Sequence, residues 1–226
     1  MLIDLRKVEK AYKTGTVVFK ALKGIDFQAE KGDYIAIVGP SGSGKSTLMN
    51  IVGCLDVPTA GEYFLEGKPV NAMSSNQLAD IRNRKVGFVF QAFNLLPYAT
   101  AYENVEVPLL FARLNGKNRK NRVLEMLARV GLADKANNKP TEMSGGEMQR
   151  TAIARALANE PDIILADEPT GNLDSQSGGE IVKIFDELRE LGKTIIIITH
   201  DVNIANRTEK IIKLKDGLID TNGNLL

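Results

Sequence analysis

The segment "GPSGSGKST" at residues 39 to 47 constrains the fold of this chain more than any other part of its sequence. It follows the short apolar run "DYIAIVG" and leads into "KSTLMNIVG", in which Leu48, Ile51 and Val52 recur at helical spacing. A strand, a glycine-rich loop and a helix in this order are the context that the nine-residue P-loop pattern requires. The sequence therefore predicts a P-loop nucleotide-binding fold. A glycine-rich turn without a ligand is the weaker interpretation.

The loop residues have distinct expected roles in holding a phosphate chain. Glycines let the backbone turn its N–H groups inward, and the helix N-terminus adds roughly half a positive charge. Lys45 is expected to reach the β- and γ-phosphates, and the Ser46 hydroxyl to coordinate the Mg²⁺ that bridges them. The predicted nucleotide-binding residues of the loop are Gly39, Pro40, Ser41, Gly42, Ser43, Gly44, Lys45, Ser46 and Thr47. Kinases, GTPases, helicases and transport ATPases share this loop, so the loop alone does not decide the reaction.

The remaining segments predict an α/β fold with a mainly parallel core sheet. The buried runs "DIILAD" and "TIIIIT" are separated by a helical segment at about residues 177 to 191, as in a parallel sheet covered on both faces. An additional small antiparallel sheet is predicted from the strands at residues 2 to 7, 17 to 28 and 61 to 68.

The middle third of the chain is predicted to be an inserted helical subdomain. Between "VGFVFQ" and "DIILAD" the apolar positions recur at helical spacing with no strand pattern, at about residues 92 to 158. The run "KIIKLKDGLI" then predicts a hairpin that turns at Asp216 and Gly217. We therefore expect a single domain over residues 1 to 226 that contains both subdomains.

Charge and cysteine content argue against a nucleic-acid partner and an internal disulfide. The 29 Lys and Arg residues balance 28 Asp and Glu residues, so we expect no nucleic-acid partner. Cys54, the single cysteine, excludes an internal disulfide and is expected to be a small buried thiol in a reducing compartment. No apolar run approaches the roughly 18 residues that span a bilayer.

Two adjacent acids, Asp167 and Glu168, follow the apolar run "IILA". The end of such a strand is the edge of a doubly wound sheet at which ligands bind. Because successive strand residues point in opposite directions, we expect Asp167 to address Mg²⁺ and Glu168 to address the attacking water. The turn at Pro169 can alter this geometry, and a strand that ends in solvated acids is the alternative.

Two further polar residues end apolar strands. His200, the only histidine, ends "TIIIITH" and is expected to contact the γ-phosphate or the attacking water, although a lone histidine is more often structural. Gln91 ends "VGFVFQ", where the predicted helical subdomain begins. We expect Gln91 to be a hinge that reports metal and phosphate occupancy to that subdomain.

A second serine and glycine segment, "MSGGEMQR", occupies residues 143 to 150. Ser144 is expected to be the N-cap of the following helix, and Glu147 completes a capping box with it. Two glycines are more than a cap needs, and they predict close approach of the backbone to an anion. The residues alone leave open whether this second loop binds another face of the same nucleotide or a different nucleotide.

The motifs "GPSGSGKST", Gln91, "MSGGEMQR", "IILADEP", "NLD" and "TH", in this order, resemble the ATP-binding cassette (ABC) ATPases over essentially the whole chain. The resemblance implies the ABC ATPase fold with ATP and Mg²⁺. It implies that two copies pack head to tail, so that the second loop of one copy holds the γ-phosphate of ATP seated on the P-loop of the other. It further implies that Tyr12 stacks on adenine and that Asp174 communicates between the two sites. By this resemblance the catalytic residues are Glu168, His200, Gln91 and Lys45. The metal-binding residues are Ser46, Gln91 and Asp167. The residues that bind the nucleotide in addition to the P-loop are Ser144, Gly145, Gly146, Glu147, Tyr12 and Asp174.

The segments "IVGCLDVPTAGE" and "GFVFQAFNLLPYATAYENVEVPLL" are similar to the branch that serves macrolide-export, lipoprotein-release and antimicrobial-peptide-export permeases. The resemblance implies a cytoplasmic subunit that is held at the inner face of the cell membrane by a separate permease. Met143 stands where leucine is usual and Glu147 where glutamine is commonest, and neither change removes a phosphate-contacting group. The alternatives are a cassette of the cell-division type, which drives a membrane complex without transport, and a soluble ABC protein that acts on ribosomes or DNA.

Overall fold

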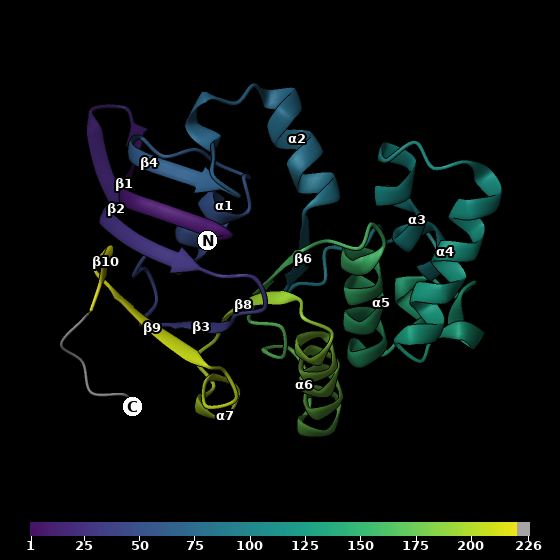
Figure 1. Ribbon diagram of the computed structural model, residues 1–226. Coiled ribbons are helices and arrows are strands. Elements are labelled where there is room, and N and C mark those ends of the chain that lie inside the picture. The colour runs from purple at the N-terminus through teal and green to yellow at the C-terminus, as the bar shows by residue number, and fades with distance from the viewer. Residues whose placement is uncertain (221–226) are drawn as a thin grey trace. The chain divides into compact units, whose positions relative to one another are not determined.

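The computed structural model describes residues 1–220, and the chain divides into two compact units (Figure 1). Unit 1 consists of Met1–Arg82 together with the segment that begins at Thr194, and unit 2 consists of residues 83–193. Residues 221–226, which fall within the single domain expected from the sequence, lie outside the described residues.

Unit 1 contains the predicted antiparallel sheet, with strand order β2-β1-β4-β5. Its strands are β1 (Ile3–Thr14), β2 (Val17–Ala29), β4 (Ala60–Leu65) and β5 (Lys68–Pro69). Strand β1 continues seven residues beyond the end predicted for it at residue 7, because its outer half pairs with β2 alone, with Tyr12 opposite Phe19. This outer half is largely exposed and therefore lacks the alternation of buried and exposed residues that marks a strand in a sequence.

Unit 1 also contains the parallel strands that precede the P-loop and His200. Strand β3 (Tyr34–Val38) is parallel to both β8 (Thr194–Ile198) and β9 (Lys210–Lys215), and every residue of β3 and β8 is buried. Such uniformly apolar strands are typical of a parallel sheet. Strand β9 turns into β10 (Leu218–Ile219) through Asp216 and Gly217, both with positive φ, which confirms the predicted hairpin.

Three helices complete this part of the chain. Helix α1 (Lys45–Val52) follows the P-loop, α2 (Ser75–Arg84) leads into unit 2, and α7 (Val202–Ala205) follows His200. The sequence did not predict α2, because Leu78 is its only buried residue and a helix without an apolar stripe leaves no periodic pattern.

Unit 2 contains one pair of parallel strands and four helices. Strand β6 (Val86–Phe90) pairs with β7 (Ile163–Asp167), with Val86 opposite Ile163. The helices are α3 (Ala101–Phe111), α4 (Gly116–Arg129), α5 (Gly145–Leu157) and α6 (Ser175–Glu190). Between β6 and β7 the described chain forms helices and turns without a strand, as the sequence predicts for this stretch.

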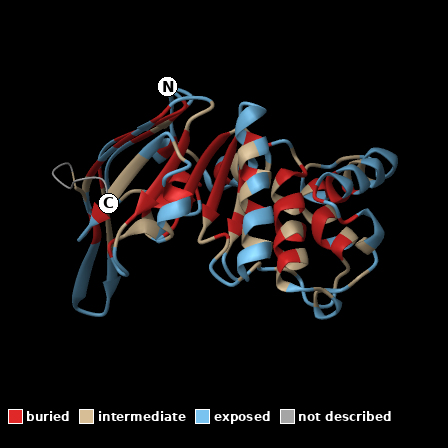
Figure 2. Ribbon diagram, turned by 90° about the horizontal axis from the view of Figure 1, so that it is seen from below, coloured by how far each residue is buried: buried red, intermediate tan, exposed pale blue. Residues whose placement is uncertain are grey.

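Buried residues follow the strands and one side of the helices (Figure 2). Cys54 is among them, and burial raises the pKa of its thiol to about 11. The expectation of a small buried thiol is therefore confirmed. None of the helices formed by residues 1–220 combines the length and the hydropathy that crossing a bilayer requires.

Candidate functional site

The P-loop in unit 1 has a backbone that only glycine fits at two positions. Gly39 has φ 155° and Gly44 has φ 105°, both on the positive side where L side chains are strained. A Cβ atom on Gly39 would lie 2.1 Å from the carbonyl oxygen of Leu214, and one on Gly44 would lie 2.7 Å from that of Ala21. The loop is therefore held tightly between β2 and β9 by contacts that leave no room for a side chain.

The polar groups of the P-loop fit an anionic ligand. The Ser43 side chain is buried, and its hydroxyl has no hydrogen-bond partner within residues 1–220. Gly44 is the N-cap of α1, and in the described chain no side chain caps this helix. Lys45 Nζ donates to the carbonyl oxygens of Gly39 and Pro40, each at 2.9 Å, which keeps the ammonium at the loop. Donors left without partners at a helix N-terminus are the groups that a phosphate satisfies.

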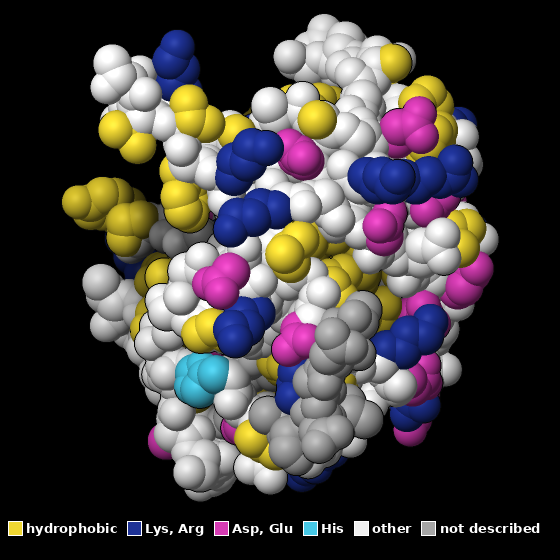
Figure 3. Space-filling view, turned by 90° about the vertical axis from the view of Figure 1, so that its left-hand side faces the viewer, with side chains coloured by type: hydrophobic (Ala, Val, Ile, Leu, Met, Phe, Trp, Pro, Cys, Tyr) yellow, Lys and Arg dark blue, Asp and Glu magenta, His cyan; other side chains and the backbone are white. Residues whose placement is uncertain are grey.

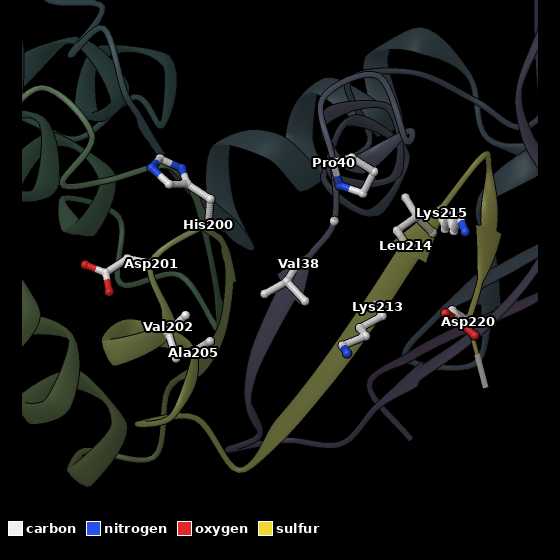
Figure 4. A pocket seen from close by; sticks show the side chains of 11 residues that line it. Val38, Pro40, His200, Asp201, Val202, Ala205, Lys213, Leu214, Lys215 and Asp220 are labelled. Carbon is white, nitrogen blue, oxygen red and sulfur yellow. The ribbon is translucent and has the colours of Figure 1, made fainter. Parts of the chain in front are cut away.

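His200 lies at the same sheet edge as the P-loop. Ile37 of β3 is level with Ile198 of β8, and the Thr199 N–H donates to the Ile37 oxygen at 3.2 Å, so both strands end together. The imidazole is exposed at the surface shown in Figure 3. It also lines a pocket of about 340 Å³ together with Gly39, Pro40 and residues of β9 (Figure 4). The predicted placement near the P-loop is therefore present, and contact with a phosphate stays a prediction.

Tyr12 lies on the outer half of β1, and 39% of its surface is exposed. Its hydroxyl donates to Asp56 Oδ2 at 3.0 Å, and Lys10 Nζ lies 5.1 Å from the centroid of its ring. The ring is thus anchored at its tip and along one face, and it remains partly accessible.

The two acids of unit 2 differ in backbone conformation. Asp167 is the last residue of β7, whereas Glu168 lies beyond the strand with φ 46°. The alternation of side chains along a strand therefore does not apply to Glu168, and our reason for assigning the two acids opposite directions was wrong for this residue. Left-handed backbone at a non-glycine residue is costly and is found preferentially at functional sites.

Gln91 contacts the segment that precedes α6. Its side-chain nitrogen donates to Asn172 Oδ1 at 3.3 Å, and Asn172 Nδ2 donates back to the Gln91 carbonyl oxygen at 3.0 Å. A Cβ atom on Gly171 would lie 2.8 Å from Gln91 Nε2. The sequence did not predict this pairing, because nothing in the local pattern relates residues 81 positions apart.

The chain immediately after Gln91 is held by the helix that follows the second loop. Phe93 and Asn94 both have positive φ, and Arg155 of α5 donates to both of their carbonyl oxygens. Burial lowers the pKa of the Arg155 guanidinium. This partly buried cation therefore holds a turn whose backbone is strained at two residues.

The second loop forms the predicted capping box. The Ser144 N–H donates to Glu147 Oε2 at 2.8 Å, and the Glu147 N–H donates to Ser144 Oγ at 3.2 Å. The first of these bonds holds the pKa of Glu147 below its usual value, and Lys135 acts in the same direction. A Cβ atom on Gly146 would lie 2.9 Å from Ser177 Oγ. This glycine therefore also has a packing role that the sequence did not indicate.

Asp174 is the N-cap of α6. Its side chain accepts hydrogen bonds from the N–H groups of Gln176 and Ser177, at 3.0 and 2.9 Å, and from Ser177 Oγ at 2.8 Å. An aspartate before "SQSGGE" is a recognisable N-cap signal. The predicted role between two nucleotide sites stays a prediction.

Each unit thus gathers part of the predicted site. Unit 1 carries the P-loop, His200 and Tyr12, and unit 2 carries Gln91, Asp167, Glu168, the capping-box loop and Asp174.

The described fold and its loops define an ATP-binding cassette. A family model described as ABC transporter matches residues 22–171, and the chain belongs to this family of ATPases.

Relatives extend this similarity over nearly the whole chain. An ABC transporter ATP-binding protein of Thermotoga maritima is 50% identical over 97% of this chain and 94% of its own length. The macrolide export ATP-binding/permease protein MacB of Rhodopseudomonas palustris is 47% identical over 96% of this chain but 33% of its own length.

Among solved structures, the cassette MJ0796 of Methanocaldococcus jannaschii, described as a dimer in a post-hydrolysis state with ADP and Pi, has a TM-score of 0.91. Its sequence is 47% identical to this chain, and the match covers 99% of each of the two chains. This similarity confirms the predicted ABC ATPase fold.

Proposed function

We propose that this chain is the ATP-hydrolysing subunit of an export or release transporter and that it drives a separate membrane permease from the inner face of the cell membrane. The main support is the similarity to MacB, a protein named for both ATP binding and a permease. This chain matches 33% of the length of MacB, which we take to be its ATP-binding part. A permease in a separate chain is supported by the T. maritima relative, 94% of which is covered by this chain. We further propose that two copies act together, as in the dimeric cassette structure.

The P-loop binds the phosphates of ATP in this proposal. The uncapped N-terminus of α1 and the buried Ser43 hydroxyl supply donors, and Lys45 moves from the loop carbonyls to the β- and γ-phosphates. Ser46, Gln91 and Asp167 are the oxygen donors that would hold Mg²⁺, which neutralises charge on the phosphates when it is bound.

Glu168 is the proposed base that orients the attacking water, and His200 contacts the γ-phosphate. Tyr12 stacks on adenine with the ring face opposite Lys10. Asp174 is proposed to link the two nucleotide sites of the dimer.

The second loop is proposed to hold the γ-phosphate of ATP bound to the partner copy. Ser144 Oγ accepts its cap bond from the Glu147 N–H, which leaves the hydroxyl proton available for another acceptor. Gly145, which begins α5, carries no side chain that would cover this end of the helix, and Glu147 fixes the turn. Cap and phosphate ligand are therefore compatible roles for the same serine.

A Glu168→Gln variant tests the catalytic assignment. Hydrolysis is expected to fall by roughly 10²- to 10⁴-fold, while ADP binding is retained, because a base is lost and the phosphate donors are not. Glu187→Gln on the exposed side of α6 is the matched control and should leave both unchanged. Loss of ADP binding in Glu168→Gln would contradict the assignment.

The same variant tests the partner. Tagged Glu168→Gln protein would be trapped with ATP and Mg²⁺ in the native organism, and the extracted complex identified by mass spectrometry. Recovery of a permease with few spans and a large extracytoplasmic domain is expected. Recovery of a cell-division complex, ribosomal proteins or DNA-bound factors in its place would overturn the transport proposal.

A further inference from the structure

Three side chains of unit 1 form a compact cluster beside the P-loop helix. Lys10 forms an ion pair with Asp56, and its Nζ also donates to the Val57 carbonyl oxygen at 3.0 Å. Asp56 uses its other carboxylate oxygen to accept from the Tyr12 hydroxyl at 3.0 Å. Only 12% of the Lys10 side chain and 28% of the Asp56 side chain are exposed. A shielded ion pair of this kind is held more strongly than one in open solvent.

The backbone that carries Asp56 is fixed from two sides. The N–H groups of Leu55 and Asp56 donate to the Asn50 carbonyl oxygen of α1 at 2.8 and 3.2 Å. On the other side, the Thr59 N–H donates to the Glu9 carbonyl oxygen of β1 at 2.8 Å. The carboxylate is therefore set at a defined position between α1 and the strand that carries Tyr12.

The Tyr12 hydroxyl is linked to the P-loop helix through Asp56. Partial burial and the bond to Asp56 raise the pKa of Tyr12. The Asp56 N–H in turn donates to the carbonyl oxygen of Asn50, which lies in α1. The tip of the ring is thus tied, through Asp56, to the helix that presents the phosphate donors.

Lys10 covers one face of the Tyr12 ring. Lys10 and Tyr12 are two positions apart on β1, so their side chains lie on the same face of the strand. The Lys10 ammonium lies over the ring, 5.1 Å from its centroid, in a cation–π contact. A flat ligand that stacks on Tyr12 would therefore take the opposite ring face and complete a stack of cation, phenol ring and base.

We propose that Asp56 and Lys10 are positioning residues that hold the Tyr12 ring in register with the P-loop and so set the affinity for the adenine part of the nucleotide. This inference rests on the proposed stacking role of Tyr12. The two residues act through the ring and do not touch the phosphates. Their loss should therefore weaken binding of nucleotides that carry a base and leave binding of a bare phosphate chain unchanged.

The test compares Mg²⁺–ADP with Mg²⁺–inorganic triphosphate, both measured by calorimetry on the full chain, together with steady-state ATP hydrolysis. Lys10→Met, Asp56→Asn and Tyr12→Phe are each expected to raise the ADP Kd and the ATP KM by roughly 3- to 10-fold, with kcat unchanged within about twofold. Triphosphate affinity should stay the same. Lys10→Arg should retain most of the affinity, because it keeps the cation.

Two controls make the test specific. Lys20→Met breaks the exposed ion pair with Glu9 in the same hairpin and removes the same charge, and it should leave ADP affinity unchanged. The double variant Tyr12→Phe with Asp56→Asn should weaken ADP binding by less than the product of the two single effects, since both act on the same contact between Tyr12 and Asp56.

If Lys10→Met and Asp56→Asn weaken the binding of ADP and of triphosphate equally, the two residues have a general structural role, and the inference is overturned. Unchanged ADP affinity in both variants would overturn it as well, and weak ADP binding in Tyr12→Ala would then show that the stacking role stands without this cluster. A Tyr12→Ala variant with normal ADP affinity would contradict the stacking role itself, and the inference with it.

Discussion

The loop before α1 and the loop before α5 both place serine and glycine at the start of a helix. The two loops differ in whether a side chain caps the N-terminal N–H groups of that helix. Gly44 leaves the N-terminus of α1 without a side-chain cap, and the buried Ser43 hydroxyl has no partner within residues 1–220. Ser144 and Glu147 instead close the N-terminus of α5 with a reciprocal pair of hydrogen bonds. The first loop therefore depends on a ligand for its donors, whereas the second already has a side-chain cap before any ligand arrives.

The largest expected difference between the loops is in nucleotide binding. Lys45→Ala should weaken ADP binding at least roughly 30-fold, equivalent to about 2 kcal/mol, because a charge-assisted contact with phosphate is lost. Ser144→Asp keeps a good N-cap and adds negative charge, so it should leave ADP binding unchanged and abolish ATP-dependent dimerisation. Calorimetry with ADP and light scattering with ATP, in a Glu168→Gln background, would measure the two effects. Equal loss of ADP affinity in both variants would remove the distinction between the loops.

A smaller difference is expected in folding stability. Gly39→Ala should cost about 2 to 5 kcal/mol, because its Cβ would overlap the Leu214 carbonyl oxygen at 2.1 Å in a backbone that disfavours alanine. Gly145→Ala gains helix propensity, and its Cβ would meet Leu173 Cδ2 at 3.3 Å and other atoms only at ordinary contact distances, so its free energy of unfolding should change by less than about 1 kcal/mol. Thermal and urea denaturation of the two variants test this ranking. A Gly145→Ala variant that is the less stable of the two would reverse it.

The smallest expected difference is a pH dependence confined to the second loop. The folded-state pKa of Glu147 lies below the usual value of 4.5, chiefly because of the bond from the Ser144 N–H. The carboxylate therefore contributes stability above the unfolded pKa, and this contribution is lost as the pH falls through the folded pKa. Urea midpoints of the wild type and Glu147→Gln should differ at pH 7 and converge as the pH falls below the folded-state pKa of Glu147, whereas Glu187→Gln should follow the wild type throughout. A constant difference across this range would argue against the capping-box carboxylate as its source.

The sequence predicts the features whose cause is local. The P-loop, the Ser144 cap and the Asp216–Gly217 hairpin each depend on a few adjacent residues, and the structure confirms the cap and the hairpin in detail. The strand and helix order follows from apolar spacing for the same reason. Helix α2 was missed because it buries a single side chain and so has no such spacing.

The features that could not be predicted depend on contacts between distant segments. The Gln91–Asn172 pair and the Arg155 bonds to Phe93 and Asn94 join residues that are more than 60 positions apart. Gly146 is a further example of a contact that the local pattern does not predict. The pair of adjacent glycines suggested an anion site, whereas the close neighbour of Gly146 in the structure is Ser177. Local patterns identify which residues carry chemistry, and the tertiary contacts decide what orients them.

The burial of Cys54 makes the chain a convenient scaffold for site-specific labelling. At neutral pH a thiol with a pKa of about 11 is almost entirely protonated, and its buried position further limits access by maleimide reagents. A cysteine introduced on an exposed part of either loop would react far faster than this native thiol. Fluorophores or spin labels can therefore be attached to the wild-type background, and distances between two copies followed through an ATP cycle.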